Sequence, residues 1–239
     1  MRALAIVHDH TSPLGPVKQA LRESGFDVVE HSVMVGPEPA DMPRSLPDFS
    51  TRFPALEGVD VVVVMGSVCS AYDPRVEAWV QAECDLLRRA DTAEIPVLGI
   101  CFGGQLLALA HGGSVRRTAH PEIGFAEVDS DDEHLVPSGP WFEWHSDRWE
   151  MPTEATEIAR NTSGPQAFVL RRNLAVQFHP EVTSDSLRGW LDNGGREVAI
   201  DFGLDPEAML AESVTTDSRS ITRAARLVQG FLSRTALGN

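Results

Sequence analysis

The sequence lacks the features that would place this chain in a membrane, outside the cell or on nucleic acid. No apolar run approaches the roughly 18–20 residues that a membrane-spanning helix needs. The apolar N-terminal stretch stops at His8, too early for a signal-peptide core, and no small-residue cleavage site follows it. Basic residues are outnumbered, since 20 Lys and Arg face 35 Asp and Glu for a formal charge of −15. Such a surface does not by itself bind phosphate backbones or anionic membranes.

Cysteine is scarce as well, and its placement argues against a disulfide framework or a thiolate metal site. The three cysteines, Cys69, Cys84 and Cys101, are odd in number and lack metal-ligand spacing. We therefore expect free thiols, a cytoplasmic location, and no metal or organic cofactor. Cys84 falls within an expected helix beside charged residues, which indicates a structural role. Cys69 falls in a loop near the expected site and has no candidate base of its own.

The first half of the chain alternates between short apolar runs and amphipathic stretches. The β-branched run at residues 59–65 is typical of a strand covered on both faces. The alternation predicts an α/β fold of the flavodoxin-like kind, an open, mostly parallel sheet with helices on both faces. The expected strands are residues 3–7, 26–31, 59–65 and 95–100, and the expected helices are residues 13–24, 74–90 and 103–111.

The rest of the chain is less regular. Residues 36–54 hold five prolines and few periodic apolar positions, which predicts an irregular surface loop. Short strands, turns and aromatics at about 114–178 indicate a small antiparallel excursion. A helical segment should follow over about 184–239, and residues 219–232 have the periodicity of a helix that packs against the sheet. With 239 residues and 42% of them hydrophobic, we expect one domain over residues 1–239.

The segment around Cys101 has the pattern of a nucleophile elbow. An apolar run leads into a Gly99-x-Cys101-x-Gly103 turn, and an expected helix follows. This is the thiol counterpart of the Gly-x-Ser-x-Gly elbow, whose glycines permit a strained turn that lifts the nucleophile above the sheet. The N-terminus of the following helix favours the thiolate. A buried structural cysteine at a tight turn is the alternative, but strand, turn and helix together favour a nucleophile.

A thiol nucleophile needs a base, and the base needs an acceptor that orients its ring. His179 and Glu181 offer both at the end of an apolar strand that begins at Leu174. Parallel strands end at a common edge, so we expect His179 to arrive at the same sheet edge as Cys101. Glu181 would accept from the far imidazole nitrogen and fix the tautomer. The alternative for His179, one of eight histidines, is a solvated residue at a strand end.

Together these residues carry a resemblance to a known family. Residues 99–105 (Gly-Ile-Cys-Phe-Gly-Gly-Gln) and 179–181 (His-Pro-Glu) resemble the signature of class I, or triad, glutamine amidotransferases. Residues 65–73 resemble the oxyanion loop of that family. Residues 122–125 and 144–147 resemble segments of its stand-alone branch, which is similar to the amidotransferase domain of GMP synthetase.

The resemblance implies a role for each matched residue. Cys101 would attack the side-chain carbonyl of glutamine, and His179, supported by Glu181, would shuttle the proton. The backbone N–H groups of Gly66 and Phe102 would stabilise the oxyanion. The residues that would line the substrate pocket are Gln105, Ser67, Tyr72 and His145, with Glu122 beside them.

The oxyanion loop departs from the family pattern. The family commonly has Gly-Gly-Pro or Gly-Pro-Gly where this chain has Gly66-Ser67-Val68. Ser67 still supplies a backbone N–H. The loop lacks, however, the proline that presets its geometry in the family.

These observations predict an enzyme that hydrolyses the side-chain amide of glutamine, or a related γ-glutamyl amide, through a glutamyl thioester, releasing ammonia or an amine. The expected ligand is glutamine or a γ-glutamyl small molecule. Because no residues remain for a synthetase domain, we expect the amidotransferase domain to stand alone. Two alternatives stay open. One is a glutaminase subunit that delivers ammonia to a separate synthetase partner, and the other is a catalytically silent regulatory module with the same fold. The sequence does not indicate an oligomeric state.

Overall fold

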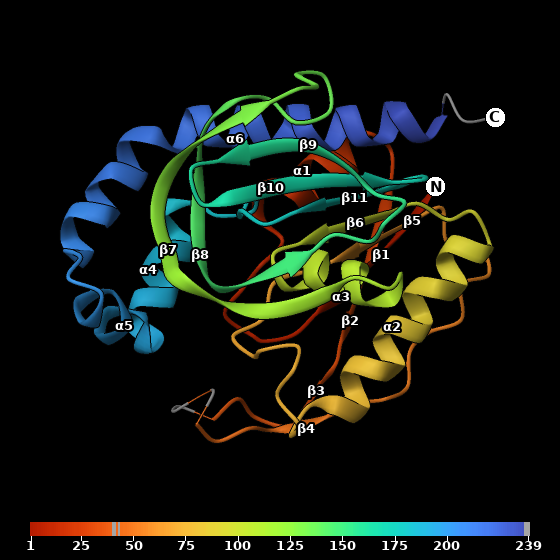
Figure 1. The fold of residues 1–239 in the computed structure, drawn as a ribbon, viewed down its shortest axis with the longest axis horizontal. Helices are drawn as coiled ribbons and strands as arrows, with labels where there is room; N and C mark the ends of the chain where they lie inside the picture. The colour runs from red at the N-terminus through yellow and green to blue at the C-terminus, as the bar shows by residue number, and fades with distance from the viewer. Residues whose placement is uncertain (40–41, 43, 237–239) are drawn as a thin grey trace.

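A mixed β-sheet forms the centre of the molecule in the computed structural model, which describes residues 1–39, 42 and 44–236 (Figure 1). The strands of this sheet are β1 (Arg2–Val7), β2 (Asp27–Ser32), β5 (Val61–Val64), β6 (Val97–Ile100), β7 (Ser114–Ser130), β8 (Gly139–Glu150), β9 (Thr156–Asn161), β10 (Gly164–Leu170) and β11 (Asn173–Val176). Over the described residues they pair in the order β2-β1-β5-β6-β11-β10-β9-β7-β8.

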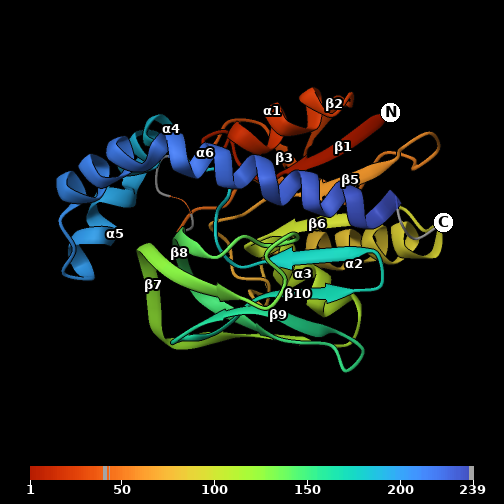
Figure 2. The same ribbon diagram turned by 90° about the horizontal axis from the view of Figure 1, so that it is seen from above.

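Half of this sheet is parallel and covered by helices on both faces. Strands β2, β1, β5, β6 and β11 run parallel to one another. Helices α1 (Gly15–Glu23) and α6 (Pro206–Ala236) pack on one face, and α2 (Glu77–Thr92) and α3 (Phe102–Ala110) pack on the other (Figure 2). Strand β5 is buried along its whole length because both faces are covered. The expected flavodoxin-like α/β class is confirmed.

The region 114–178 forms the expected antiparallel excursion. Strands β10, β9, β7 and β8 pair antiparallel, and β7 and β8 form a long ribbon that curves around one end of the sheet (Figure 1). Strand β11 then returns to pair in parallel with β6, with Leu174 opposite Leu98. This pairing places the residues that follow β11 next to Cys101, which follows β6.

The expectation of an irregular surface loop at residues 36–54 is partly wrong. Strand β4 (Asp48–Phe49) lies in this segment and pairs with β3 (Met34–Val35). The Phe49 ring stacks on Trp79 with 4.3 Å between centroids, so the loop contributes to the core over α2. The remaining expectation for residues 40, 41 and 43 lies outside the described residues.

The helices differ from expectation in their bounds. Helix α2 begins at Glu77 and not at Pro74, because the Asp73 carboxylate accepts a hydrogen bond from the Arg75 N–H at 2.9 Å and forms a turn first. Helix α6 packs on the sheet as expected, but it is longer than residues 219–232. Helices return at Ser184 as expected, as α4 (Ser184–Trp190), the π-helical turn η1 (Leu191–Gly195) and α5 (Arg196–Asp201).

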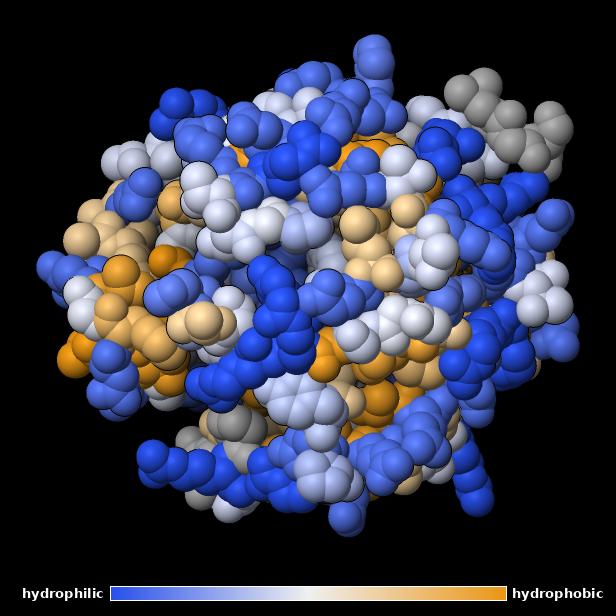
Figure 3. Space-filling view, in the orientation of Figure 1, coloured by the Kyte–Doolittle hydropathy of each residue, from blue (hydrophilic) through white to orange (hydrophobic). Residues whose placement is uncertain are grey.

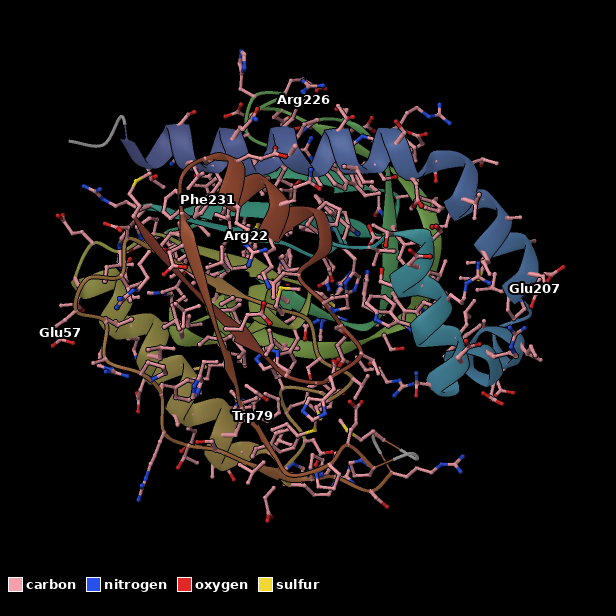
Figure 4. The ribbon with its side chains drawn as sticks, turned by 180° about the vertical axis from the view of Figure 1, so that it is seen from behind. Arg22, Glu57, Trp79, Glu207, Arg226 and Phe231 are labelled. Atoms are coloured by element: carbon pink, nitrogen blue, oxygen red, sulfur yellow. The ribbon has the colours of Figure 1, made fainter. Side chains whose placement is uncertain are left out.

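Polar and charged residues cover most of the face seen in Figure 3, with apolar residues in small groups between them. On α6, Phe231 turns toward the sheet and Arg226 turns away from it (Figure 4). Of the helices in the described part of the chain, none combines the length and the apolarity needed to cross a membrane.

Candidate active site

Cys101 occupies a strained turn between β6 and α3. Its φ is +49°, a left-handed conformation that residues other than glycine seldom adopt. The flanking glycines permit the close packing of this turn. A Cβ at Gly99 would lie 2.6 Å from the carbonyl oxygen of Gly103, and one at Gly103 would lie 2.2 Å from that of Val64. The Cys101 N–H donates to the Val176 carbonyl at 2.7 Å, which ties the turn to β11.

The Cys101 thiol lies among hydrogen-bond donors. Helix α3 begins at the next residue, so its N-terminal dipole favours a negative charge on the sulfur. The side-chain Nε2 of Gln177 donates to Sγ at 3.5 Å, and both side chains are buried. We did not expect Gln177 from the sequence. A signal was present, because Gln177 lies two residues before His179 and breaks an apolar run at the end of β11.

His179 and Glu181 form a buried pair. The imidazole Nδ1 lies 2.7 Å from Glu181 Oε1, with the side chains 6% and 1% exposed. Because a carboxylate only accepts, Nδ1 carries the hydrogen and Nε2 is left for another partner. Burial disfavours the imidazolium, but the charges of Glu181 and Cys101 outweigh it and hold the pKa of His179 well above its usual range. This is the electrostatic arrangement that a thiolate–imidazolium pair needs.

Gly66 brings the loop after β5 against this pair. A Cβ at Gly66 would lie 3.2 Å from His179 Cε1 and 3.8 Å from Cys101 Cβ, so glycine permits the close approach. The N–H groups of Gly66 and Phe102 have no acceptor within the described residues. Free backbone donors on both sides of a nucleophile are the arrangement that an oxyanion hole requires.

Asp147 holds the loop in place from β8. Its carboxylate accepts from Ser70 Oγ at 2.5 Å and from the Tyr72 hydroxyl at 2.8 Å, while its backbone carbonyl accepts from Gln105 Nε2 at 3.2 Å. Tyr72 is 48% exposed and lies at the rim, whereas Gln105 is buried. Burial and the Asp147 carboxylate raise the pKa of Tyr72. The sequence expectation named Tyr72 and Gln105 as pocket residues but gave no role to Asp147, which lies in the matched segment 144–147 and joins them.

The departure at Ser67-Val68 is accommodated by a side-chain turn. The Ser67 hydroxyl accepts a hydrogen bond from the Cys69 N–H at 3.2 Å, which restrains the loop in the place of a proline. Burial raises the pKa of Cys69 to about 11 and that of Cys84 to about 12, so both thiols stay protonated at neutral pH. Neither thiol lies at the N-terminus of a helix beside a side-chain donor, as that of Cys101 does.

His145 belongs to a buried ion-pair cluster on the antiparallel ribbon. Its Nε2 lies 3.3 Å from carboxylate oxygens of both Glu122 and Glu143, and its Nδ1 donates to the Asp147 carbonyl at 2.9 Å. Burial disfavours the charged ring, but the two carboxylates prevail and raise the pKa of His145 to about 10. Burial raises the pKa of Glu143, whereas for Glu122 burial is outweighed by His145 and the pKa is lowered.

Glu143 did not appear among the sequence candidates. Residues 143, 145 and 147 alternate along β8 and share one of its faces, which is the signal that links them. Within the described residues, no group of three or more His, Cys, Asp and Glu side chains is placed to hold a metal ion.

Comparisons with known proteins show the family to which the chain belongs. The family model described as Glutamine amidotransferase class-I matches residues 19–195. A glutamine-hydrolysing GMP synthase of Ralstonia nicotianae is 31% identical over 193 residues, covering 73% of this chain and 33% of the relative. One from Sulfurimonas denitrificans is 38% identical over 107 residues, covering 37% of this chain and 20% of the relative. The chain therefore spans a third or less of the length of these relatives.

Solved structures resemble the chain over nearly its whole length. A glutamine amidotransferase from Thermotoga maritima is 25% identical with a TM-score of 0.81, covering 97% of this chain and 98% of the other. A glutamine amidotransferase from Methylobacillus flagellatus is 23% identical with a TM-score of 0.76, covering 98% and 94%. The second likeness concerns the fold alone.

Proposed function

The chain belongs to the class-I glutamine amidotransferase family, and we propose that it hydrolyses the side-chain amide of glutamine, or of a related γ-glutamyl compound, with Cys101 as nucleophile. The observation that carries this proposal is the convergence at one sheet edge of a strained cysteine, a buried His179–Glu181 pair and two free backbone donors. Each is a part that acyl transfer from an amide requires.

Acylation begins with the transfer of the Cys101 proton to Nε2 of His179. The sulfur attacks the carbonyl carbon of the substrate amide. The carbonyl oxygen becomes an oxyanion that the N–H groups of Gly66 and Phe102 stabilise. Each such donor contributes about 10²–10³-fold to turnover in enzymes of this kind. When the C–N bond breaks, His179 returns the proton to the leaving nitrogen, so ammonia or an amine departs and a thioester remains.

Deacylation uses the same groups. His179 removes a proton from water, the hydroxide attacks the thioester carbon, and the C–S bond breaks as Cys101 regains a proton. Glu181 keeps the ring in the tautomer that both steps need. The products are a γ-carboxylate and a free enzyme.

The substrate would bind between the loop after β5 and the β8 ribbon. We assign pocket-lining roles to the backbone of Ser67 and to Gln105, Tyr72 and His145. The support for this assignment is that Gln105, Tyr72 and His145 all hydrogen-bond to Asp147.

The use of the released nitrogen separates two versions of this function. In one, residues 1–239 form a single domain that acts alone on γ-glutamyl compounds. In the other, the chain delivers ammonia to a separate synthetase partner, which is favoured by relatives named as glutamine-hydrolysing GMP synthases of about three times the matched length. The intact set of Cys101, His179 and Glu181 argues against a silent regulatory module.

Turnover of glutamine and of a γ-glutamyl dipeptide by purified protein tests the proposal. Cys101→Ser should abolish glutamate release and labelling by an electrophilic glutamine analogue. Cys84→Ala, which removes a buried thiol between α2 and α3, is the matched control and should retain both. Comparable activity in Cys101→Ser would refute the nucleophile. Weak glutamine turnover that rises on adding a synthetase would favour the subunit version.

A further inference from the structure

A buried polar cluster lies beneath the loop after β5 and has no role in the reaction described above. His8 follows β1, and Glu83 lies one turn after Trp79 on α2. Trp79 is labelled in Figure 4. His8 Nε2 lies 3.0 Å from Glu83 Oε1, and the Trp79 indole N–H donates to Glu83 Oε2 at 2.5 Å. The exposed fractions are 1% for His8 and Trp79 and 0% for Glu83. Buried ionisable pairs add little net stability compared with apolar packing, so this cluster calls for another explanation.

The ring nitrogen of His8 that does not face Glu83 points at the oxyanion loop. His8 Nδ1 lies 2.8 Å from the carbonyl oxygen of Gly66. A carbonyl only accepts, so Nδ1 must carry a hydrogen. The opposite nitrogen faces the Glu83 carboxylate, which keeps the ring in the orientation that directs the Nδ1–H toward Gly66.

This hydrogen bond completes the restraint on Gly66. The peptide before Gly66 is held because the Met65 carbonyl accepts from the Gly103 N–H at 3.1 Å. The peptide after Gly66 is held by His8. Glycine is the residue with the greatest backbone freedom, and the loop has no proline to limit it. Without His8, the peptide after Gly66 would be free to rotate.

The same cluster packs against the second proposed donor. The Phe102 ring meets His8 edge-on at 5.2 Å and stacks on Trp79 at 5.3 Å between centroids. Phe102 itself is fully buried at the start of α3. The cluster therefore contacts both residues whose N–H groups flank Cys101.

We propose that His8, oriented by Glu83 and Trp79, is a positioning residue: its hydrogen bond fixes the Gly66–Ser67 peptide and so keeps the loop that carries the Gly66 N–H in place beside Cys101. The inference rests on the proposed hydrolysis by Cys101. It assigns the support of the oxyanion loop to a buried cluster between the end of β1 and α2.

Two substitutions at His8 separate this role from a structural one. In His8→Asn the amide nitrogen replaces Nδ1 and can still donate to the Gly66 carbonyl. In His8→Gln the amide reaches the position of Nε2, beside Glu83, and leaves the Gly66 carbonyl without its donor. The measurements are kcat and KM for glutamine, the rate of Cys101 alkylation by iodoacetamide, and the urea midpoint of unfolding.

Alkylation by iodoacetamide is a displacement at a saturated carbon and forms no oxyanion. We therefore expect His8→Gln to lower kcat by about tenfold, less than the loss of a whole oxyanion donor would, while KM and the alkylation rate change little. His8→Asn should retain kcat within a few-fold. Equal kcat values in the two variants, or an alkylation rate that falls in parallel with kcat, would overturn the proposal.

If His8→Gln does not fold, Trp79→Phe keeps an aromatic ring beside Phe102 and removes the hydrogen bond to Glu83. It should lower kcat several-fold at an unchanged alkylation rate, and an unchanged kcat would overturn the proposal. If the wild-type protein releases no glutamate and resists labelling at Cys101, the proposed function itself has failed, which the wild-type measurement alone reveals.

Discussion

Replacing Glu181 with glutamine tests how far the activity depends on the carboxylate behind His179. Glu181 Oε1 lies 2.7 Å from Nδ1 in a buried site, so the carboxylate both fixes the tautomer and stabilises the imidazolium. A glutamine amide can donate as well as accept. The ring of the variant can therefore reverse its tautomer and present an N–H, in place of a lone pair, to Cys101.

The expected loss follows from both effects. In serine protease triads, the corresponding Asp-to-Asn change lowers kcat about 10⁴-fold; a thiol is more acidic than a serine hydroxyl, so we expect a smaller loss of about 10²–10³-fold here. KM should change little, because Glu181 is buried behind His179. Since the Glu181 charge raises the pKa of His179, its removal should shift the alkaline limb of the activity profile to lower pH.

The assay is glutamate release as a function of pH for wild type and Glu181→Gln. Glu207→Gln is the matched control, because it removes an exposed carboxylate on α6 that pairs with Arg196. A kcat for Glu181→Gln close to the wild-type value, or an alkaline limb that does not move, would refute the assignment of His179 and Glu181 as base and orienting acceptor.

Three further predictions concern separate parts of the site. Gln177→Leu removes the 3.5 Å donor to Cys101. Since a hydrogen bond to a charged group contributes about 1.5–3 kcal/mol, the change should slow iodoacetamide alkylation at neutral pH about 10- to 10²-fold. An unchanged rate would exclude a role in holding the thiolate. The pKa of His145 is raised to about 10, so the stability that its charged form contributes is fully present below about pH 6.5 and is lost as pH rises toward 10. The urea midpoint of unfolding should therefore fall over this window in the wild type and fall less in His145→Gln. Parallel curves for the two proteins would contradict this. Gly103→Ala places a Cβ 2.2 Å from the Val64 carbonyl oxygen and should lower the thermal midpoint and slow labelling of Cys101, whereas a variant with wild-type labelling would show that the elbow tolerates the shift.

The parts of the site that lie close together in the sequence were predictable. The glycines around Cys101 report a strained turn because only their missing side chains permit it. His179 and Glu181 are two residues apart, so their pairing needs little more than the end of a strand. Apolar runs likewise indicated the strands of the parallel half of the sheet, because burial on both faces leaves a pattern in the sequence itself.

Parts that depend on distant contacts were not predictable. Strand β11 lies between β6 and β10, with Val176 opposite Ile100 of β6. This pairing brings Gln177 within reach of the sulfur of Cys101. Asp147 meets Ser70 across 77 residues of chain. A lone polar residue in a sequence carries no sign of which distant partner will satisfy it, since satisfaction depends on where two elements cross.

The sequence by itself therefore determined the fold class, the cysteine elbow and the histidine–carboxylate pair, because each is encoded by residue types at short spacing. Tertiary structure decided how the oxyanion loop is held without a proline. His8 meets the Gly66 carbonyl across 58 residues and Glu83 across 75, and these contacts exist only because β1, β5 and α2 pack together in the folded sheet. The physical reason is that chain geometry at short range is set by local sterics, whereas a buried hydrogen bond between distant residues is set by the register of the elements that carry them.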